Sequence, residues 1–169
     1  MRIAIVGNSG SGKSTLARQW GEAHGLELLD LDRLAWEPGK IAVARDPALA
    51  LADLRAFCES RRGWVVEGCY AGLIEACLAT ASLLVFLDPG VEACLANCRA
   101  RPWEPHKFVS KQAQDEKLGF LLAWASEYYV RDGDLSLQAH AALFDNARCR
   151  KVRLTGRADA AQVAQLAWP

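Results

Sequence analysis

The sequence lacks the features that would point to a membrane protein, a disordered chain or a nucleic-acid-binding protein. No run of apolar residues approaches the ~20 residues that an α-helix needs to cross a bilayer. Acidic and basic residues balance at 20 each, so no excess positive charge favours nucleic acid or an anionic membrane surface. Hydrophobic residues make up 51% of the chain, which is not the composition of a disordered protein. We therefore expect one compact domain over residues 1–169, with neither a membrane nor a nucleic-acid partner.

Cysteine and histidine are present without the spacing that a metal site or a disulfide framework needs. None of the six cysteines forms a C-x-x-C pair, and the three histidines lie far apart. The first apolar strand pattern begins at residue 2, which leaves no room for a signal peptide. We therefore expect a cytoplasmic protein with reduced thiols, and favour this over a zinc site.

One glycine-rich segment near the start matches the P-loop pattern G-x-x-x-x-G-K-[ST] at every fixed position. It follows an apolar strand pattern over residues 3–6 and precedes a helical pattern. Glycines allow a tight loop whose N–H groups surround a phosphate, and the dipole of the following helix favours an anion. The segment therefore predicts a nucleoside triphosphate site, with a ligand-free turn as the alternative. Its residues are Gly7, Asn8, Ser9, Gly10, Ser11, Gly12, Lys13, Ser14 and, in the helix, Thr15.

Two side chains of this segment carry the chemistry of the predicted site. Lys13 brings a positive charge to the β- and γ-phosphates, and the Ser14 hydroxyl is a ligand for Mg²⁺. The motif thus predicts ATP and Mg²⁺ as the bound groups.

Strand and helix patterns alternate along the whole chain. This alternation predicts an α/β fold of the P-loop NTPase type, a five-stranded parallel sheet with helices on both faces. The expected strands cover residues 2–6, 26–29, 64–66, 83–87 and 151–155. After the P-loop helix, further helices are expected from 47, 73, 91, 111, 136 and 158, the one from 111 running to about 131.

Acidic residues follow the second strand, at the edge where open parallel sheets bind ligands. Asp30 and Asp32 are two apart, and on an extended segment such side chains share a face. We expect Asp30 to hold a Mg²⁺-bound water and Asp32 to accept a hydrogen bond from an acceptor hydroxyl. The alternative is two solvated acids in a turn.

The third and fourth strands also end in acids, which compete for one role. Glu67 and Asp88 could each fix the water shell of Mg²⁺, as a Walker-B carboxylate does. Asp88 precedes proline, and Asp-Pro commonly starts a turn. We therefore favour Glu67 as the metal-site residue.

Three arginines are candidates to offset phosphate charge. Arg99 and Arg101 diverge by ~200° on a continuous helix, but Pro102 ends that helix and frees Arg101 to turn. The polar, proline-containing segment that follows predicts a helical, lid-like insertion over about 102–135, with an ordinary surface loop as the alternative. Arg131 lies at the end of this region, where it returns to the phosphates or remains solvated.

Aromatic residues are interpreted mainly as packing. Tyr128 and Tyr129 continue the apolar stripe of the long helix and are expected in the core. Trp36 follows the acid pair and either lines a substrate pocket or fills the core.

These motifs resemble those of P-loop kinases of the adenylate kinase and shikimate kinase group, over nearly the whole chain. Shikimate kinases carry a D-x-D like that at residues 30–32, with one acid near Mg²⁺ and the other on substrate hydroxyls. They also have an Arg-Pro entering the lid, as at residues 101–102. Residues 5–16 and 31–36 are most similar to bacterial adenylate-kinase-related proteins labelled topology modulation proteins, which read I-x-G-x-S-G-S-G-K-S-T-L and L-D-x-L-x-W.

The acceptor half of the resemblance departs from both families. Adenylate kinases have a threonine-arginine helix after the second strand, which is missing here, and shikimate kinases have a glycine triplet where this chain has Gly68-Cys69-Tyr70. We expect a monomeric kinase that transfers the γ-phosphoryl group of ATP to a nucleotide-like or polyol-like small molecule. The alternative is a P-loop NTPase that hydrolyses or senses nucleotide and acts through a macromolecular partner.

Overall fold

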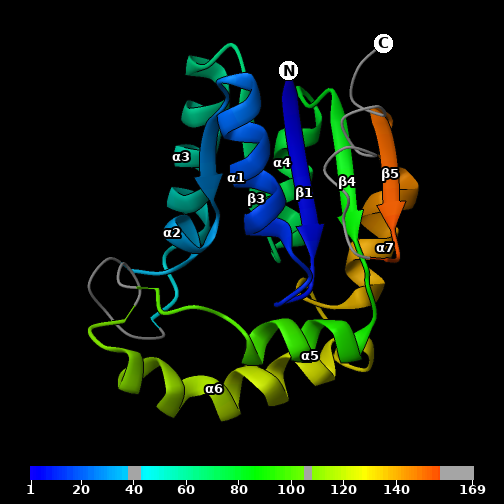
Figure 1. Cartoon of the computed structure of the whole chain (residues 1–169). Helices are drawn as coiled ribbons and strands as arrows, with labels where there is room; N and C mark the ends of the chain where they lie inside the picture. Colours follow the sequence, from blue (N-terminus) through cyan, green and yellow to red (C-terminus); the bar gives the residue numbers. More distant parts are fainter. Residues whose placement is uncertain (38–42, 105–107, 157–169) are drawn as a thin grey trace.

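In the computed structural model, which describes residues 1–37, 43–104 and 108–156, one parallel sheet forms the centre of the molecule (Figure 1). Its strand order is β2-β3-β1-β4-β5. The strands are β1 (Arg2–Gly7), β2 (Glu27–Asp30), β3 (Trp64–Gly68), β4 (Leu83–Leu87) and β5 (Arg150–Leu154). This confirms the predicted α/β fold with a five-stranded parallel sheet.

The helices begin and end where their cap residues require. Gly25 adopts the left-handed conformation that closes the first helix, and the Asp46 side chain accepts from the Ala48 N–H at the start of the third. Ser110 and Ser136 cap two later helices in the same way. The described helices are α1 (Lys13–His24), α2 (Asp32–Ala35), α3 (Pro47–Ser60), α4 (Ala71–Leu78), α5 (Val91–Arg99), α6 (Lys111–Ser126), the 3₁₀ helix η1 (Glu127–Tyr129) and α7 (Leu137–Asn146).

Strand residues alternate between two apolar cores, one on each face of the sheet. Ile3 and Ile5 of β1 point into a core that contains Trp20 of α1. Ala4 and Val6 point the other way, into a core built with α3, α4 and α7. Because both faces are covered, the central strands are apolar throughout, as buried parallel strands must be.

The structure differs from the sequence prediction in two elements, and a third predicted element cannot be compared. The long helix ends at Ser126 and continues as η1, instead of running to about residue 131. The short helix α2 was not predicted at all. The predicted closing helix from residue 158 lies outside the described residues.

Helices α5 and α6 lie across the carboxyl ends of the strands (Figure 1). Ala125 is the fully buried residue of α6, so this helix is attached to the body of the protein mainly at its C-terminal end. No helix in the described parts of the chain is long and apolar enough to cross a membrane.

Candidate active site

The P-loop connects β1 to α1 through backbone conformations that favour glycine. Gly10 has a φ of +77°, and a Cβ there would lie 2.2 Å from the carbonyl oxygen of Cys94 in α5. Gly12 has a φ of +96° and is the N-cap residue of α1. The loop is therefore packed directly beneath α5, which leaves space for no side chain at Gly10.

Two asparagines hold the P-loop in place. The Asn8 side chain donates through Nδ2 to the carbonyl of Ala125, at 2.8 Å, and accepts from the N–H of Ser9, also at 2.8 Å. Asn97 of α5 donates through Nδ2 to the Gly10 carbonyl at 2.8 Å. The loop is thus fixed by both helices that cross the strand ends.

Lys13 carries the central positive charge of the site and is only 7% exposed. Its Nζ donates to the carbonyl oxygen of Asn8 at 2.8 Å. Burial lowers the pKa of Lys13, but the acidic groups of Cys69, Glu67 and Asp32 outweigh it and raise the pKa above its usual value. The ammonium is therefore charged at neutral pH.

Glu67, at the end of β3, is 3% exposed and lies beside Asp30 in the register of the sheet. Burial raises the pKa of Glu67, and the charge of Asp30 raises it further. Lys13 and the nearby Ser14 side chain act in the opposite direction and lower the pKa of Glu67. The structure thus brings together Lys13, Ser14, Asp30 and Glu67, which the sequence analysis assigned to the phosphate and metal sites.

Asp30 and Asp32 do not lie on one extended segment, so that part of the prediction was wrong. Asp30 ends β2, Leu31 is helical and buried, and Asp32 is the first residue of α2. The Asp32 N–H donates to Asp30 Oδ1 at 2.9 Å. Both carboxylates nevertheless influence the pKa of Glu67, which shows that they lie at the same edge of the sheet.

A tyrosine and a tryptophan orient Asp32. The Tyr70 hydroxyl donates to Asp32 Oδ1 at 2.8 Å and accepts from Trp36 Nε1 at 2.9 Å. Burial, followed by the charge of Asp32, raises the pKa of Tyr70, so its hydroxyl remains a donor. Trp36 is 40% exposed, which argues against the core-filling interpretation. Tyr70 was not predicted, since no local pattern marks it.

Asp88 connects structural elements through its side chain. Its carboxylate accepts from the Tyr129 hydroxyl at 2.6 Å and from Arg153 Nη2 at 2.7 Å. It therefore joins the end of β4 to β5 and to η1. Tyr129 itself is partly exposed, contrary to the expectation that it lies in the core.

The three candidate arginines have different surroundings. Arg99 is exposed, and Arg101 forms an ion pair with Glu104 at 3.4 Å. Arg131 stacks its guanidinium on the Trp124 ring, 3.5 Å from the ring centre. Its Nε and one terminal nitrogen are buried without a hydrogen-bond partner in the described parts of the chain. Burial lowers the pKa of Arg131 from its usual value, while the nearby Glu127 and Cys69 raise it.

A buried histidine, His140, contacts the turn that follows β3. His140 Nε2 lies 2.7 Å from the Cys69 carbonyl, and its Nδ1 lies 2.7 Å from the Tyr128 hydroxyl. Because a carbonyl only accepts, Nε2 carries the proton and Nδ1 accepts from Tyr128. Burial lowers the pKa of His140 to about 4, so the ring is neutral at physiological pH.

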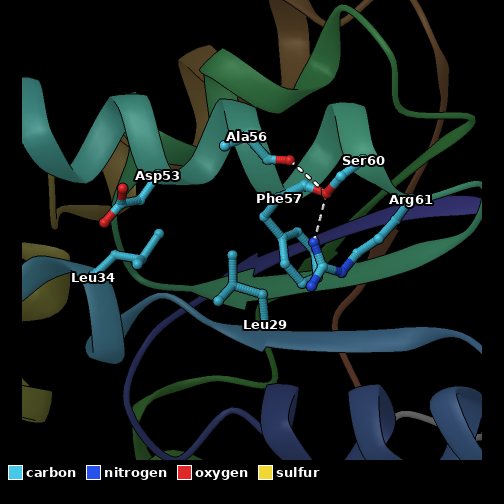
Figure 2. A pocket seen from close by; sticks show the side chains of 7 residues that line it. All are labelled: Leu29, Leu34, Asp53, Ala56, Phe57, Ser60 and Arg61. Carbon is cyan, nitrogen blue, oxygen red and sulfur yellow. Dashed lines mark hydrogen bonds between the residues drawn. The ribbon is translucent and has the colours of Figure 1, made fainter.

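A surface pocket of about 330 Å³ lies elsewhere, against β2, α2 and α3 (Figure 2). Arg61 packs over the Phe57 ring on one side of it. No predicted site residue lines this pocket, so it takes no part in the candidate site. Its lining residues are Leu29, Leu34, Asp53, Ala56, Phe57, Ser60 and Arg61.

The residues present fit a nucleoside triphosphate and Mg²⁺. The buried ammonium of Lys13 and the unpartnered nitrogens of Arg131 are donors that suit phosphate oxygens. In the described parts of the chain, no group of three or more His, Cys, Asp or Glu side chains could hold a metal ion. A cation here would therefore depend on Ser14 and on the phosphates themselves, as in P-loop sites.

No protein-family model matches the chain, and no curated protein matches its sequence. Solved structures of kinases share its fold. A shikimate kinase from Acinetobacter baumannii, in complex with shikimate, is 22% identical, with 97% of this chain and 88% of that chain covered and a TM-score of 0.52. A gluconokinase from Sinorhizobium meliloti 1021 is 20% identical (98% and 88% covered, TM-score 0.53).

A third kinase structure extends the likeness to a nucleoside kinase. A deoxyadenosine kinase from M. mycoides, with bound dATP, is 12% identical, with 98% of this chain and 96% of that chain covered and a TM-score of 0.51. At these identities the likeness shows that the fold is the one used by P-loop kinases for small molecules.

The low pKa of His140 predicts a pH-dependent component of stability. The folded state resists protonation of this ring, whereas the unfolded state takes up the proton near pH 6.5. The free energy of unfolding should therefore fall as the pH drops from 6.5 to about 4, by about 3 kcal/mol from this group. Urea unfolding of the natural protein and of His140→Gln across this range measures it, and equal pH slopes would contradict the prediction.

Proposed function

We propose that this protein is a P-loop kinase that transfers the γ-phosphoryl group of ATP to a small-molecule acceptor. The observation that carries the proposal is the buried Lys13 ammonium in a glycine loop at the start of α1, with Ser14 and Glu67 beside it. A lysine charge this deeply buried suits a polyanionic ligand better than it suits the core. The kinase folds of the similar structures support the same reaction class.

Separate residues would bind the phosphates and Mg²⁺. The P-loop N–H groups and Lys13 bind and orient the phosphates, because they are fixed donors in a site partly shielded from water. Ser14 would be the direct ligand of Mg²⁺, and Asp30 and Glu67 would hold its water shell. When bound, the ion would neutralise charge on the β- and γ-phosphates.

We propose Arg131 as the arginine that contacts the transferred group. Its two buried nitrogens lack acceptors, and an oxyanion would supply them. Arg101 would have to leave Glu104 to take part, and the exposed Arg99 would have to turn inward. We therefore assign the main charge-offsetting role to Arg131 and secondary roles to the other two.

Asp32 would accept a hydrogen bond from the attacking hydroxyl of the acceptor. Tyr70 already donates to one of its oxygens, which holds the carboxylate in one orientation. The exposed indole of Trp36, tied to the same hydroxyl, offers a flat surface beside the carboxylate. Nucleosides and cyclic polyols both suit such a surface.

An acceptor screen tests the proposed reaction directly. The protein is incubated with Mg²⁺ and ATP, together with nucleoside monophosphates, nucleosides, sugars or shikimate-like polyols, and the phosphorylated product is identified by mass spectrometry. We expect one class of acceptor to accelerate ADP release and to appear as its monophosphorylated product. ADP release that no acceptor changes would favour the alternative, a nucleotide-hydrolysing protein that acts on a macromolecule.

Substitution of the P-loop lysine tests nucleotide binding. Lys13→Ala should weaken ATP binding by about 1.5–3 kcal/mol, because it removes a charge-assisted contact to phosphate. Isothermal titration calorimetry measures this, with Glu22→Ala, an exposed charge on the same helix, as the control. A folded Lys13→Ala variant with unchanged affinity would falsify the phosphate site.

Substitution of the two aspartates separates their roles. Asp32→Asn should lower acceptor turnover by about 100-fold, since it removes the charge that accepts the hydroxyl proton, and should leave ATP affinity nearly intact. Asp30→Asn should instead raise the Mg²⁺ concentration needed for half-maximal rate. Steady-state kinetics measures both quantities. If Asp32→Asn bound ATP more weakly but kept its acceptor turnover at saturating ATP, the assignment would be contradicted.

Because α6 is attached mainly at its C-terminal end, we expect its N-terminal part to be more mobile than its C-terminal part. Residues 108–117 have few buried contacts, and Val109 is almost fully exposed, whereas Ala125 is buried. Amide hydrogen exchange should be faster at 108–117 than at 121–126 in the free protein. It should slow at 108–117 when a non-hydrolysable ATP analogue binds, if this segment acts as a lid. Equal exchange with and without bound analogue would argue for an ordinary surface segment.

A further inference from the structure

A buried hydrogen-bonded pair connects the segment after α6 to the turn after β3. Tyr128 and His140 are 1% and 0% exposed. The Tyr128 hydroxyl donates to His140 Nδ1, and His140 Nε2–H donates to the Cys69 carbonyl, each at 2.7 Å. The His140 and Phe86 rings also pack at right angles, with ring centres 6.0 Å apart and the planes at 89°. The imidazole is therefore held in one tautomer and one orientation.

The carbonyl that receives this hydrogen bond lies inside the candidate site. Cys69 is two residues after Glu67 and directly before Tyr70, whose hydroxyl binds Asp32. The Cys69 side chain also raises the pKa of Lys13, the charged residue of the phosphate side. A change in the direction of the Cys69 carbonyl would therefore move groups on both the phosphate side and the acceptor side.

The other end of the connection is attached to the P-loop. Ala125, three residues before Tyr128, accepts from the Asn8 side chain in a buried hydrogen bond of 2.8 Å. One short segment, 125–128, thus holds the loop after β1 through Ala125 and the turn after β3 through Tyr128 and His140. These two connections start from the buried end of α6, whose other end lies in the lid-like region.

We propose that Tyr128 and His140 are positioning residues that align the turn carrying Glu67 and Tyr70 with the P-loop. Neither side chain contacts the phosphates or the acceptor; both act through the Cys69 carbonyl. The inference rests on the proposed function for its kinetic consequence, but the alignment itself is a property of the free protein. It also explains why a polar pair occupies a buried place where two apolar side chains would pack without hydrogen-bonding requirements.

Tyr128→Phe tests the connection, because it removes one hydroxyl and keeps the ring. The matched control is Tyr129→Phe, the same change one residue later, where the hydroxyl binds Asp88 at the other side of η1. We expect Tyr128→Phe to speed amide exchange at residues 69–71 about fivefold and to lower kcat about tenfold, with ATP affinity changed less than twofold. Tyr129→Phe should leave both quantities within a factor of two of the natural protein.

Two substitutions of His140 provide the rescue. The side-chain amide of His140→Gln can donate to the Cys69 carbonyl and accept from Tyr128, whereas His140→Leu can do neither. We expect the His140→Gln variant to retain most of kcat and slow amide exchange at residues 69–71. The His140→Leu variant should lose both. Thermal unfolding identifies any variant that fails to fold, and the remaining variants then decide the comparison.

The outcomes separate this inference from the proposed function. If the natural protein phosphorylates no acceptor, the proposed function fails, and the exchange data alone decide whether Tyr128 and His140 order the turn. If it does phosphorylate one, but Tyr128→Phe and His140→Leu behave like Tyr129→Phe in exchange and in kcat, the inference is wrong. A loss of ATP affinity equal to the loss of kcat would also overturn it, since the pair would then act on nucleotide binding.

Discussion

The charge of the Lys13 ammonium, buried at the carboxyl edge of the sheet, is the constraint on which the site depends. A buried unpaired charge would be strongly destabilising, so partners must surround it. They come from separate strand ends: the Asn8 carbonyl after β1, Asp32 after β2 and Glu67 at the end of β3. The order β2-β3-β1 places these ends side by side. The same arrangement that satisfies the lysine leaves carboxylates and a helix N-terminus facing one edge, as a phosphate and metal site requires.

The segment where α6 continues into η1 connects three loops and strand ends at the carboxyl edge of the sheet. It holds the P-loop through Asn8, the turn after β3 through Tyr128 and His140, and the end of β4 through Tyr129 and Asp88. Arg131 follows immediately, with its guanidinium against Trp124. Because α6 also leads back to the proposed lid, movement there would reach the strand ends through a few buried hydrogen bonds. This segment is therefore the physical link through which the proposed lid would act on the geometry of the site.

Local sequence patterns were sufficient for the sheet, most helices and the P-loop. Strand apolarity, the Gly25 and Asp46 caps and the glycine-rich motif each depend on neighbouring residues, so they are readable from the sequence. Tyr70, Tyr128 and His140 were missed as site residues because their roles arise from contacts between segments far apart in the chain. The relation of Asp30 to Asp32 was wrong because Leu31 is helical, and nothing local distinguishes a strand that continues from one that turns into α2. The acceptor is undetermined for the same reason: the groups that would select it come from several separate elements.

A crystal structure with Mg²⁺ and a non-hydrolysable ATP analogue would show whether Lys13 serves a bound triphosphate. We expect Lys13 Nζ to leave the Asn8 carbonyl for oxygens of the β- and γ-phosphates, Ser14 to coordinate the ion, and Arg131 to gain an oxyanion partner. An analogue bound away from the P-loop, with Lys13 still donating to Asn8, would contradict it.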